Sequence, residues 1–178
     1  MKPLRPPSTS LLDKYYGQEP RELYSTSVTV TGGDAAHARA SGVARSDDGN
    51  LDVNLRLPAE LGGAGDGTNP EQLFAAAYAA CLHGALSLIA AKAGIAIPGA
   101  SVAASVTFGR DPVDGLFMLS ADVRIHLPGV ERDVARALVR NTERFSPYAK
   151  MARQGIVNVI TLASPGDQAD AGDEAQDA

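Results

Sequence analysis

One stretch, residues 68–94 with the sequence TNPEQLFAAAYAACLHGALSLIAAKAG, decides how this chain folds. Its first residues form a strong helix start. Asn69 suits the N-cap, Pro70 suits the first helical position, and Gln72 suits the third, as in a capping box. Gly94 is a residue type that commonly follows the last helical turn. The sequence therefore predicts one long helix that runs to about residue 93.

The apolar part of this helix, residues 73–91, approaches the length of a membrane span and is interrupted only by His83, Gly84 and Ser87. Alanine, which dominates the segment, is a weak membrane former, and a central histidine is costly in lipid. We therefore expect a core helix that is covered by a sheet or by a second subunit, and no membrane partner.

Alternating and β-branched runs predict the strands around the helix. They lie at residues 24–31, 43–46, 51–57, 102–108, 117–127 and 156–162. An amphipathic helix is expected at residues 131–144, and a short helix begins at Ser146-Pro147 and ends at Gly155. The order β-β-β-α-β-β-α-α-β predicts an α+β fold with mainly antiparallel pairing.

Length and composition indicate a single globular domain, because 178 residues with 44% hydrophobic content can build a core. We expect it at residues 23–163, between a proline-rich arm (1–22) and a disordered acidic tail (164–178). The net charge of −5 comes from five acids in the tail, while the other 16 acids balance 16 bases. Such a neutral body argues against nucleic acid as a partner. The arm lacks the apolar run of a secretory signal, so a cytoplasmic location is expected.

Cys81 is the only cysteine of the chain and cannot form an internal disulfide. With only three histidines beside it, a Cys/His zinc site lacks ligands, and no metal or cofactor is expected. Helical spacing places Cys81 in one stripe with Phe74, Tyr78, Ala85 and Leu88. Two interpretations stay open. Cys81 is a small buried hydrophobe, as free cysteines often are, or it is a reactive thiol.

A reactive thiol needs a positive neighbour, and the long helix does not provide one. Cys81 lies about 11 residues past the helix start, where the helix dipole has faded, and His83 points to the opposite side. Glu71 lies ten residues earlier, about 15 Å away along the helix. If the two share a site, one of them comes from another subunit. An arginine held between thiolate and carboxylate is the geometry to look for.

Several motifs together closely resemble the organic hydroperoxide resistance (Ohr) proteins of the OsmC superfamily. The resemblance covers about residues 24–163. It is carried by Glu60-Leu61-Gly62-Gly63-Ala64-Gly65, by residues 68–76, by Ala79-Ala80-Cys81, and by Thr31-Gly32-Gly33, Ser46-Asp47-Asp48-Gly49, His126-Leu127-Pro128-Gly129 and Pro147-Tyr148.

The resemblance implies an OsmC-like fold in which antiparallel sheets wrap around long central helices in an intertwined homodimer, with active sites at the subunit boundary. It implies that Cys81 is the peroxidatic cysteine and that Glu71 is the active-site glutamate. Counting back from Asp48-Gly49 makes Arg39 the active-site arginine, with Arg45 as the alternative. The apolar side chains near the thiol that are expected to bind a bulky organic hydroperoxide are Phe74, Tyr78 and Leu82.

Ser146 occupies the position at which family members usually carry a resolving cysteine. A serine cannot form a disulfide with an oxidised Cys81, so resolution by an external thiol is expected, and the family's use of lipoyl groups makes a dithiol the natural reductant. The same serine leaves a second function open. On the same fold, the chain would be a lipid-ligand-binding or oxidant-sensing protein that does not turn over.

Overall fold

The computed structural model describes residues 15–33 and 41–163. Its elements are β1 (Val28–Thr31), β2 (Gly42–Ser46), β3 (Asp52–Leu55), the short 3-10 helix η3 (Ala59–Leu61), α1 (Pro70–Lys92), β4 (Ser101–Arg110), β5 (Phe117–His126), α2 (Arg132–Phe145) and α3 (Pro147–Gln154). Strands and helices both contribute, and every strand pair among these elements is antiparallel. The expected α+β class is therefore confirmed.

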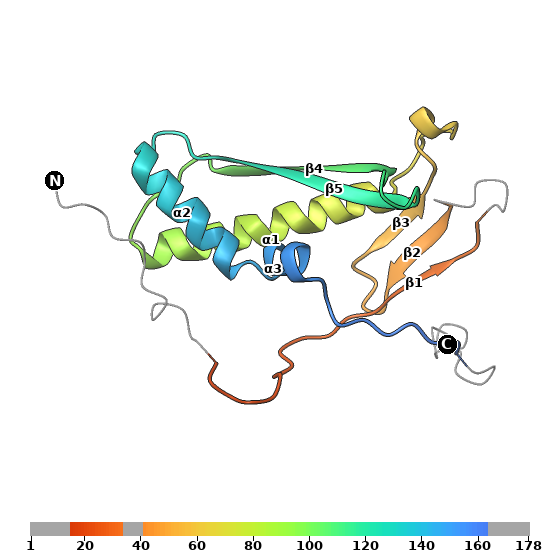
Figure 1. Ribbon diagram of the computed structural model, residues 1–178, viewed down its shortest axis with the longest axis horizontal. Helices are drawn as coiled ribbons and strands as arrows, with labels where there is room; N and C mark the ends of the chain where they lie inside the picture. The colour runs from red at the N-terminus through yellow and green to blue at the C-terminus, as the bar shows by residue number, and fades with distance from the viewer. Residues whose placement is uncertain (1–14, 34–40, 164–178) are drawn as a thin grey trace, which may run out of the picture.

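Two separate sheets lie around the long helix. Strands β1, β2 and β3 form one sheet in that order, and β4 pairs with β5 in a long hairpin. The hairpin lies along α1, α2 crosses α1 toward its C-terminal end, and the three-stranded sheet stands at the other end of the molecule (Figure 1). The N-terminal end of α1 thus points toward the β1–β3 sheet.

The turn between β2 and β3 is held by Asp48. Its carboxylate accepts hydrogen bonds from the Ser46 hydroxyl at 2.6 Å and from the backbone and side-chain amides of Asn50 at 3.0 and 2.8 Å. These bonds, that from Ser46 first, stabilise the charged form and lower the pKa of Asp48 from 3.8 to about 2. Gly49 follows at φ +73°, a conformation that other residues rarely adopt. These residues thus form the turn that joins the strands expected at residues 43–46 and 51–57.

The start of α1 is built as its sequence predicts. The Asn69 side chain accepts a hydrogen bond from the Gln72 backbone N–H at 2.9 Å, and Pro70 is the first helical residue. The Gln72 side chain does not close the expected capping box, because it accepts a hydrogen bond from the Thr68 hydroxyl at 3.0 Å instead. Thr68 is in turn bonded through its backbone to Asn54 of β3. These bonds fix where the helix leaves the sheet.

The core lies between α1, the β4–β5 hairpin and α2. Its main cluster is buried and consists of Leu86, Ile89, Ala90, Val134 and Leu138. A second cluster, nearer the start of α1, joins Tyr78 and Leu82 to Ala149 of α3. The buried stripe of α1 therefore runs through Tyr78, Leu82, Leu86 and Ile89. Leu88, which was expected on the stripe of Cys81, is 49% exposed. Cys81 lies at the flank of the core.

Much of α1 is not covered by its own chain. By length and composition the helix could cross a membrane, with a mean hydropathy of 1.8 over 18 residues, of which 28% are buried. A core helix of a soluble protein passes the same test, and α1 packs against β4, α2 and α3. Its exposed residues are mostly small or apolar, and the polar exceptions are Gln72, His83 and Lys92.

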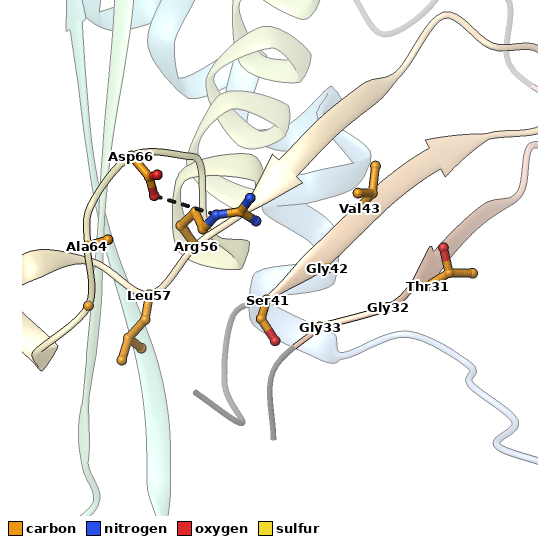
Figure 2. A pocket seen from close by; sticks show the side chains of 11 residues that line it. Thr31, Gly32, Gly33, Ser41, Gly42, Val43, Arg56, Leu57, Ala64 and Asp66 are labelled. Carbon is orange, nitrogen blue, oxygen red and sulfur yellow. Dashed lines mark ion pairs between the residues drawn. The ribbon is translucent and has the colours of Figure 1, made fainter. Parts of the chain in front are cut away.

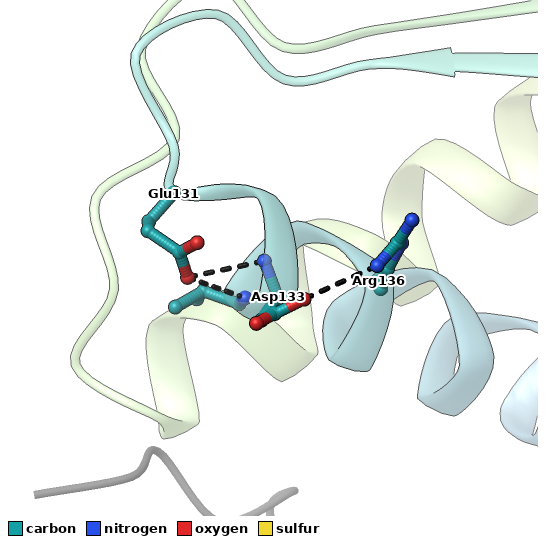
Figure 3. Close-up of polar contacts among 4 residues, drawn as sticks. Glu131, Asp133 and Arg136 are labelled. Carbon is teal, nitrogen blue, oxygen red and sulfur yellow. Dashed lines mark hydrogen bonds and ion pairs between the residues drawn. The ribbon is translucent and has the colours of Figure 1, made fainter.

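Helices α2 and α3 are separated by a single residue, Ser146. Glu131 caps α2 by accepting hydrogen bonds from the backbone N–H groups of Asp133 and Val134, and Asp133 pairs with Arg136 at 3.3 Å (Figure 3). The expected amphipathic helix and the short helix after Ser146 are both confirmed.

Two strand predictions differ from the structure. Residues 156–162 were expected to form a last strand, and this prediction is wrong for the single chain. The run has no strand partner among the described residues, and Val157, Ile160 and Leu162 are 100%, 91% and 99% exposed. β-Branched residues extend the backbone, but a strand also needs a neighbour with which to pair. The first strand, expected at 24–31, is formed only over Val28–Thr31.

Candidate functional site

Cys81 lies in the middle of α1 and is half-buried. Its Sγ atom is 3.4 Å from the Oγ atom of Ser146, within hydrogen-bond distance for sulfur. The two residues are 65 positions apart in the sequence. The structure therefore brings the single thiol of the chain against Ser146, the residue that was expected at the resolving position.

Ser146 is fixed by the two helices that it joins. Its backbone N–H donates to the Thr142 carbonyl at 2.9 Å, which ends α2. Its Oγ atom accepts a hydrogen bond from the Ala149 N–H at 3.2 Å, which caps α3. The residue is only 1% exposed. The hydroxyl that faces Cys81 is therefore held in place and shielded from solvent.

Glu71 does not meet Cys81 within one chain. It occupies the first turn of α1 and is half-buried, and no cation pairs with it among residues 15–33 and 41–163. The separation of ten positions between Glu71 and Cys81 corresponds to about 15 Å of helix. Since α1 is one uninterrupted helix, no movement within it can close this gap.

Arg39 and Arg45 are the two arginines considered for the active site. Arg39 lies outside the described residues. Its alternative, Arg45, is 59% exposed and pairs with Asp52 on the neighbouring strand at 3.1 Å. This cross-strand ion pair gives Arg45 a structural role in the β1–β3 sheet.

A cavity of about 490 Å³ lies where the ends of β1 and β2 meet the loop before α1 (Figure 2). Gly33 and Ser41, the residues on either side of the segment that contains Arg39, both line it. Arg56 also lines it and pairs with Asp66 at 3.5 Å. Sequence reasoning missed Arg56. The feature of the sequence that could have indicated Arg56 is its position directly after Leu55, a buried strand residue.

The residues expected to bind the apolar part of a substrate lie around α3. Tyr78 and Leu82 line a cavity of about 360 Å³ together with Val123, Ile125 and Ala149, and the pair Glu143–Arg153 lies at 3.0 Å on the same cavity. Phe74 is half-buried beside it, with its ring 5.9 Å from that of Tyr78.

Tyr148 completes this aromatic group, with its ring 6.1 Å from Tyr78 and 6.5 Å from Phe74. The sequence placed Tyr148 in a family motif but gave it no role. No local feature of the sequence indicates that its ring packs against Tyr78 and Phe74.

In the described part of the chain, no three His, Cys, Asp or Glu side chains come together as metal ligands would. The chemistry that the arrangement offers is that of a thiol. A half-buried sulfur lies beside a buried hydroxyl, on the same helix as Phe74 and Tyr78 of the aromatic group. Such a thiol can act as a nucleophile if its ionised form is stabilised.

Sequence comparison finds close relatives. The family model "OsmC-like protein" matches residues 63–161. An organic hydroperoxide resistance protein of Xanthomonas axonopodis pv. citri is 43% identical over 143 residues, which cover 79% of this chain and 95% of that protein. The organic hydroperoxide resistance protein OhrB of Bacillus subtilis is 36% identical over 134 residues, or 75% and 93% of the two chains.

Solved structures of organic hydroperoxide resistance proteins have a fold similar to that of this chain. The crystal structure of an organic hydroperoxide resistance protein from Legionella pneumophila superposes with a TM-score of 0.67 at 36% identity and covers 76% of this chain and 93% of that one. The crystal structure of OhrB from Bacillus subtilis superposes with a TM-score of 0.63 at 37% identity, over 75% and 93%. These proteins thus share the arrangement of elements with this chain.

Proposed function

Since the chain belongs to the OsmC-like family and, within it, to the organic hydroperoxide resistance proteins, we propose that it is a cytoplasmic, thiol-dependent peroxidase that reduces organic hydroperoxides to alcohols. The observation that carries the proposal is the position of Cys81. The sulfur is half-buried and adjoins a buried hydroxyl, and Tyr78, a member of the apolar aromatic group, lies about one turn before it on α1. This is a suitable environment for a nucleophile that meets an apolar substrate.

The proposed reaction has two stages. The Cys81 thiolate attacks the terminal oxygen of the hydroperoxide, an S–O bond forms, the O–O bond breaks, and the alkoxide takes a proton to become the alcohol. Cys81 is left as a sulfenic acid. An external thiol then condenses with it, releasing water, and a second thiol reduces the mixed disulfide. A dithiol such as a dihydrolipoyl group supplies both thiols.

An external reductant is required because Ser146 occupies the place from which a second cysteine would act. Its hydroxyl is 3.4 Å from the Cys81 sulfur but has no sulfur with which to form a disulfide. The cycle therefore uses one cysteine, and Cys81 is exposed to over-oxidation whenever the reductant is scarce.

The complete site is proposed to form in a homodimer. Glu71 is about 15 Å from Cys81 along one helix, so a glutamate that acts at this thiol comes from the partner chain. In this arrangement Glu71 orients the guanidinium of Arg39, which stabilises the thiolate. The ion pair of Arg45 with Asp52 supports the choice of Arg39.

The open apolar surfaces support the same assembly. Residues 156–162 leave α3 as an extended apolar run, and less than a third of the most apolar window of α1 is buried by its own chain (Figure 1). Apolar surface of this extent is typical of protein–protein interfaces. An intertwined dimer would give the run a strand with which to pair and would cover α1.

We expect Ile160→Asp to separate the dimer, because a charge in a buried apolar interface is strongly unfavourable. The wild-type protein should elute in size-exclusion chromatography with light scattering at twice the 18.4 kDa chain mass, and the variant at the mass of one chain. Val113→Asp is the matched control, since Val113 is equally exposed at 91% but lies in the β4–β5 turn. A wild-type protein that elutes as a monomer contradicts the shared site.

The peroxide preference tests the function itself. With dihydrolipoamide as reductant, kcat/KM for cumene hydroperoxide should exceed that for hydrogen peroxide by at least about tenfold, since burying an aromatic group contributes about 1.5–3 kcal/mol. Peroxide consumption in steady state measures both values. Equal values contradict the substrate class.

A second function is favoured by the absence of a resolving thiol at Ser146. An oxidant sensor or a lipid-ligand-binding protein would use the same cavity of about 360 Å³ without turnover. One equivalent of peroxide would then be consumed in a burst that no added thiol restarts. Sustained turnover with dihydrolipoamide excludes this alternative.

A further inference from the structure

The hydroxyl of Ser146 has more hydrogen-bonding capacity than the cap of α3 uses. A serine hydroxyl offers one O–H donor and two acceptor lone pairs. One lone pair accepts the Ala149 N–H at 3.2 Å. Ser146 is 1% exposed, so solvent water is not available to accept a hydrogen bond from its O–H group. Among the contacts of the described residues, the Cys81 sulfur at 3.4 Å is the group placed to accept it.

The direction of this hydrogen bond depends on the charge of Cys81. With a neutral thiol, either atom can donate. An ionised thiol has no proton left, so the serine must donate and the sulfur must accept. Hydrogen bonds to a charged acceptor are about twice as strong as those between neutral groups. The contact therefore stabilises the thiolate more than the thiol.

Two features of α3 strengthen the stabilisation of the thiolate by the Ser146 hydroxyl. The Ala149 N–H that donates to the Ser146 oxygen polarises its O–H bond, because linked hydrogen bonds reinforce one another. Ser146 also stands at the N-terminus of α3, the end that carries partial positive charge. The cap of α3 and the contact with sulfur thus operate through the same oxygen atom.

We propose that Ser146 donates a hydrogen bond to the Cys81 thiolate and holds it ionised and oriented for reaction. The inference deepens the proposed function and rests on it for its biological meaning. Ser146 then takes part in the reaction as a positioning residue. It cannot resolve the sulfenic acid, but it stabilises the nucleophile.

The test is the pH profile of Cys81 alkylation by iodoacetamide, measured on the native full-length protein without peroxide. In Ser146→Ala and Ser146→Gly, the midpoint should rise by about one pH unit, which means about tenfold less thiolate at a given pH below the midpoint. Glycine is nearly as good an N-cap as serine, so Ser146→Gly removes the hydroxyl while largely preserving α3. Ser146→Thr should bring the midpoint back toward the wild-type value.

Gly155→Ala is the control for a merely structural role. Gly155 ends α3 at φ +74°, which strains any other residue, so the variant weakens α3 from its far end while the Ser146 hydroxyl stays in place. Its alkylation profile should match the wild type. A Ser146→Gly midpoint equal to that of the wild type overturns the inference, as does a Gly155→Ala shift as large as that of Ser146→Ala.

The outcomes separate this inference from the proposed function. If the midpoint rises in Ser146→Gly but the wild type does not turn over hydroperoxides, the thiolate contact stands and the peroxidase assignment fails. If the wild type turns over hydroperoxides and the midpoint does not move, the peroxidase assignment stands and the contact fails.

Discussion

Replacing Cys81 by serine is expected to abolish the reduction of organic hydroperoxides, with a loss of at least about a thousandfold in kcat/KM, as is usual when a nucleophile is removed. A serine hydroxyl stays protonated near neutral pH, and its oxygen cannot form the sulfenic acid on which the cycle depends. Consumption of cumene hydroperoxide in the presence of dihydrolipoamide measures the loss.

The matched control for this variant is Ala85→Ser. Ala85 lies one turn further along the same side of α1, so the variant adds the same hydroxyl to the same helix and leaves the Cys81 sulfur in place. Its activity should be within a fewfold of the wild type. Residual activity of Cys81→Ser comparable to that of Ala85→Ser would show that another group performs the chemistry, and the proposed function would fall.

Replacing Ser146 by cysteine is expected to convert the one-cysteine cycle into a two-cysteine cycle. The two side-chain atoms are already 3.4 Å apart, and small rotations bring such atoms to the bonding distance of about 2.05 Å. After one equivalent of organic hydroperoxide, the Cys81 sulfenic acid should condense with the new thiol. The intact mass should then fall by about 2 Da, whereas the wild type gains about 16 Da.

Lys150→Cys provides the comparison for this variant. It also gives the chain a second thiol on α3, but at an exposed position away from the contact with Cys81. It should gain oxygen without an internal loss of two hydrogens. If Ser146→Cys also shows no such loss, the contact at 3.4 Å does not describe the protein in solution.

The fold was largely predictable because its signals are local. The N-cap at Asn69, the turn at Asp48-Gly49 and the apolar spacing of α2 each act within a few residues. Their positions in the structure agree with the sequence to within a few residues. The strand expected at residues 156–162 does not form in the single chain, because a strand also needs a partner, which the local sequence does not specify.

The candidate site was predictable only in part. The residue types at Cys81, Glu71 and Ser146 could be taken from the motifs, but the contact between Cys81 and Ser146 spans 65 positions and depends on how α3 folds back against α1. Arg56 and Tyr148 could not be ranked from sequence, because their importance comes from the cavity and the ring cluster that the fold assembles.

The extended run after α3 also favours aggregation of any chain in which residues 156–162 have no partner strand. Residues 156–162 are rich in β-branched side chains, exposed and without a strand partner in the described chain, and such segments promote aggregation through mismatched β-pairing. Five acids follow within the last 15 residues of the sequence. Repulsion between these charges opposes the stacking of runs from many chains, as gatekeeper residues do beside hydrophobic strands. We therefore expect that removing these five acids would increase aggregation of the chain.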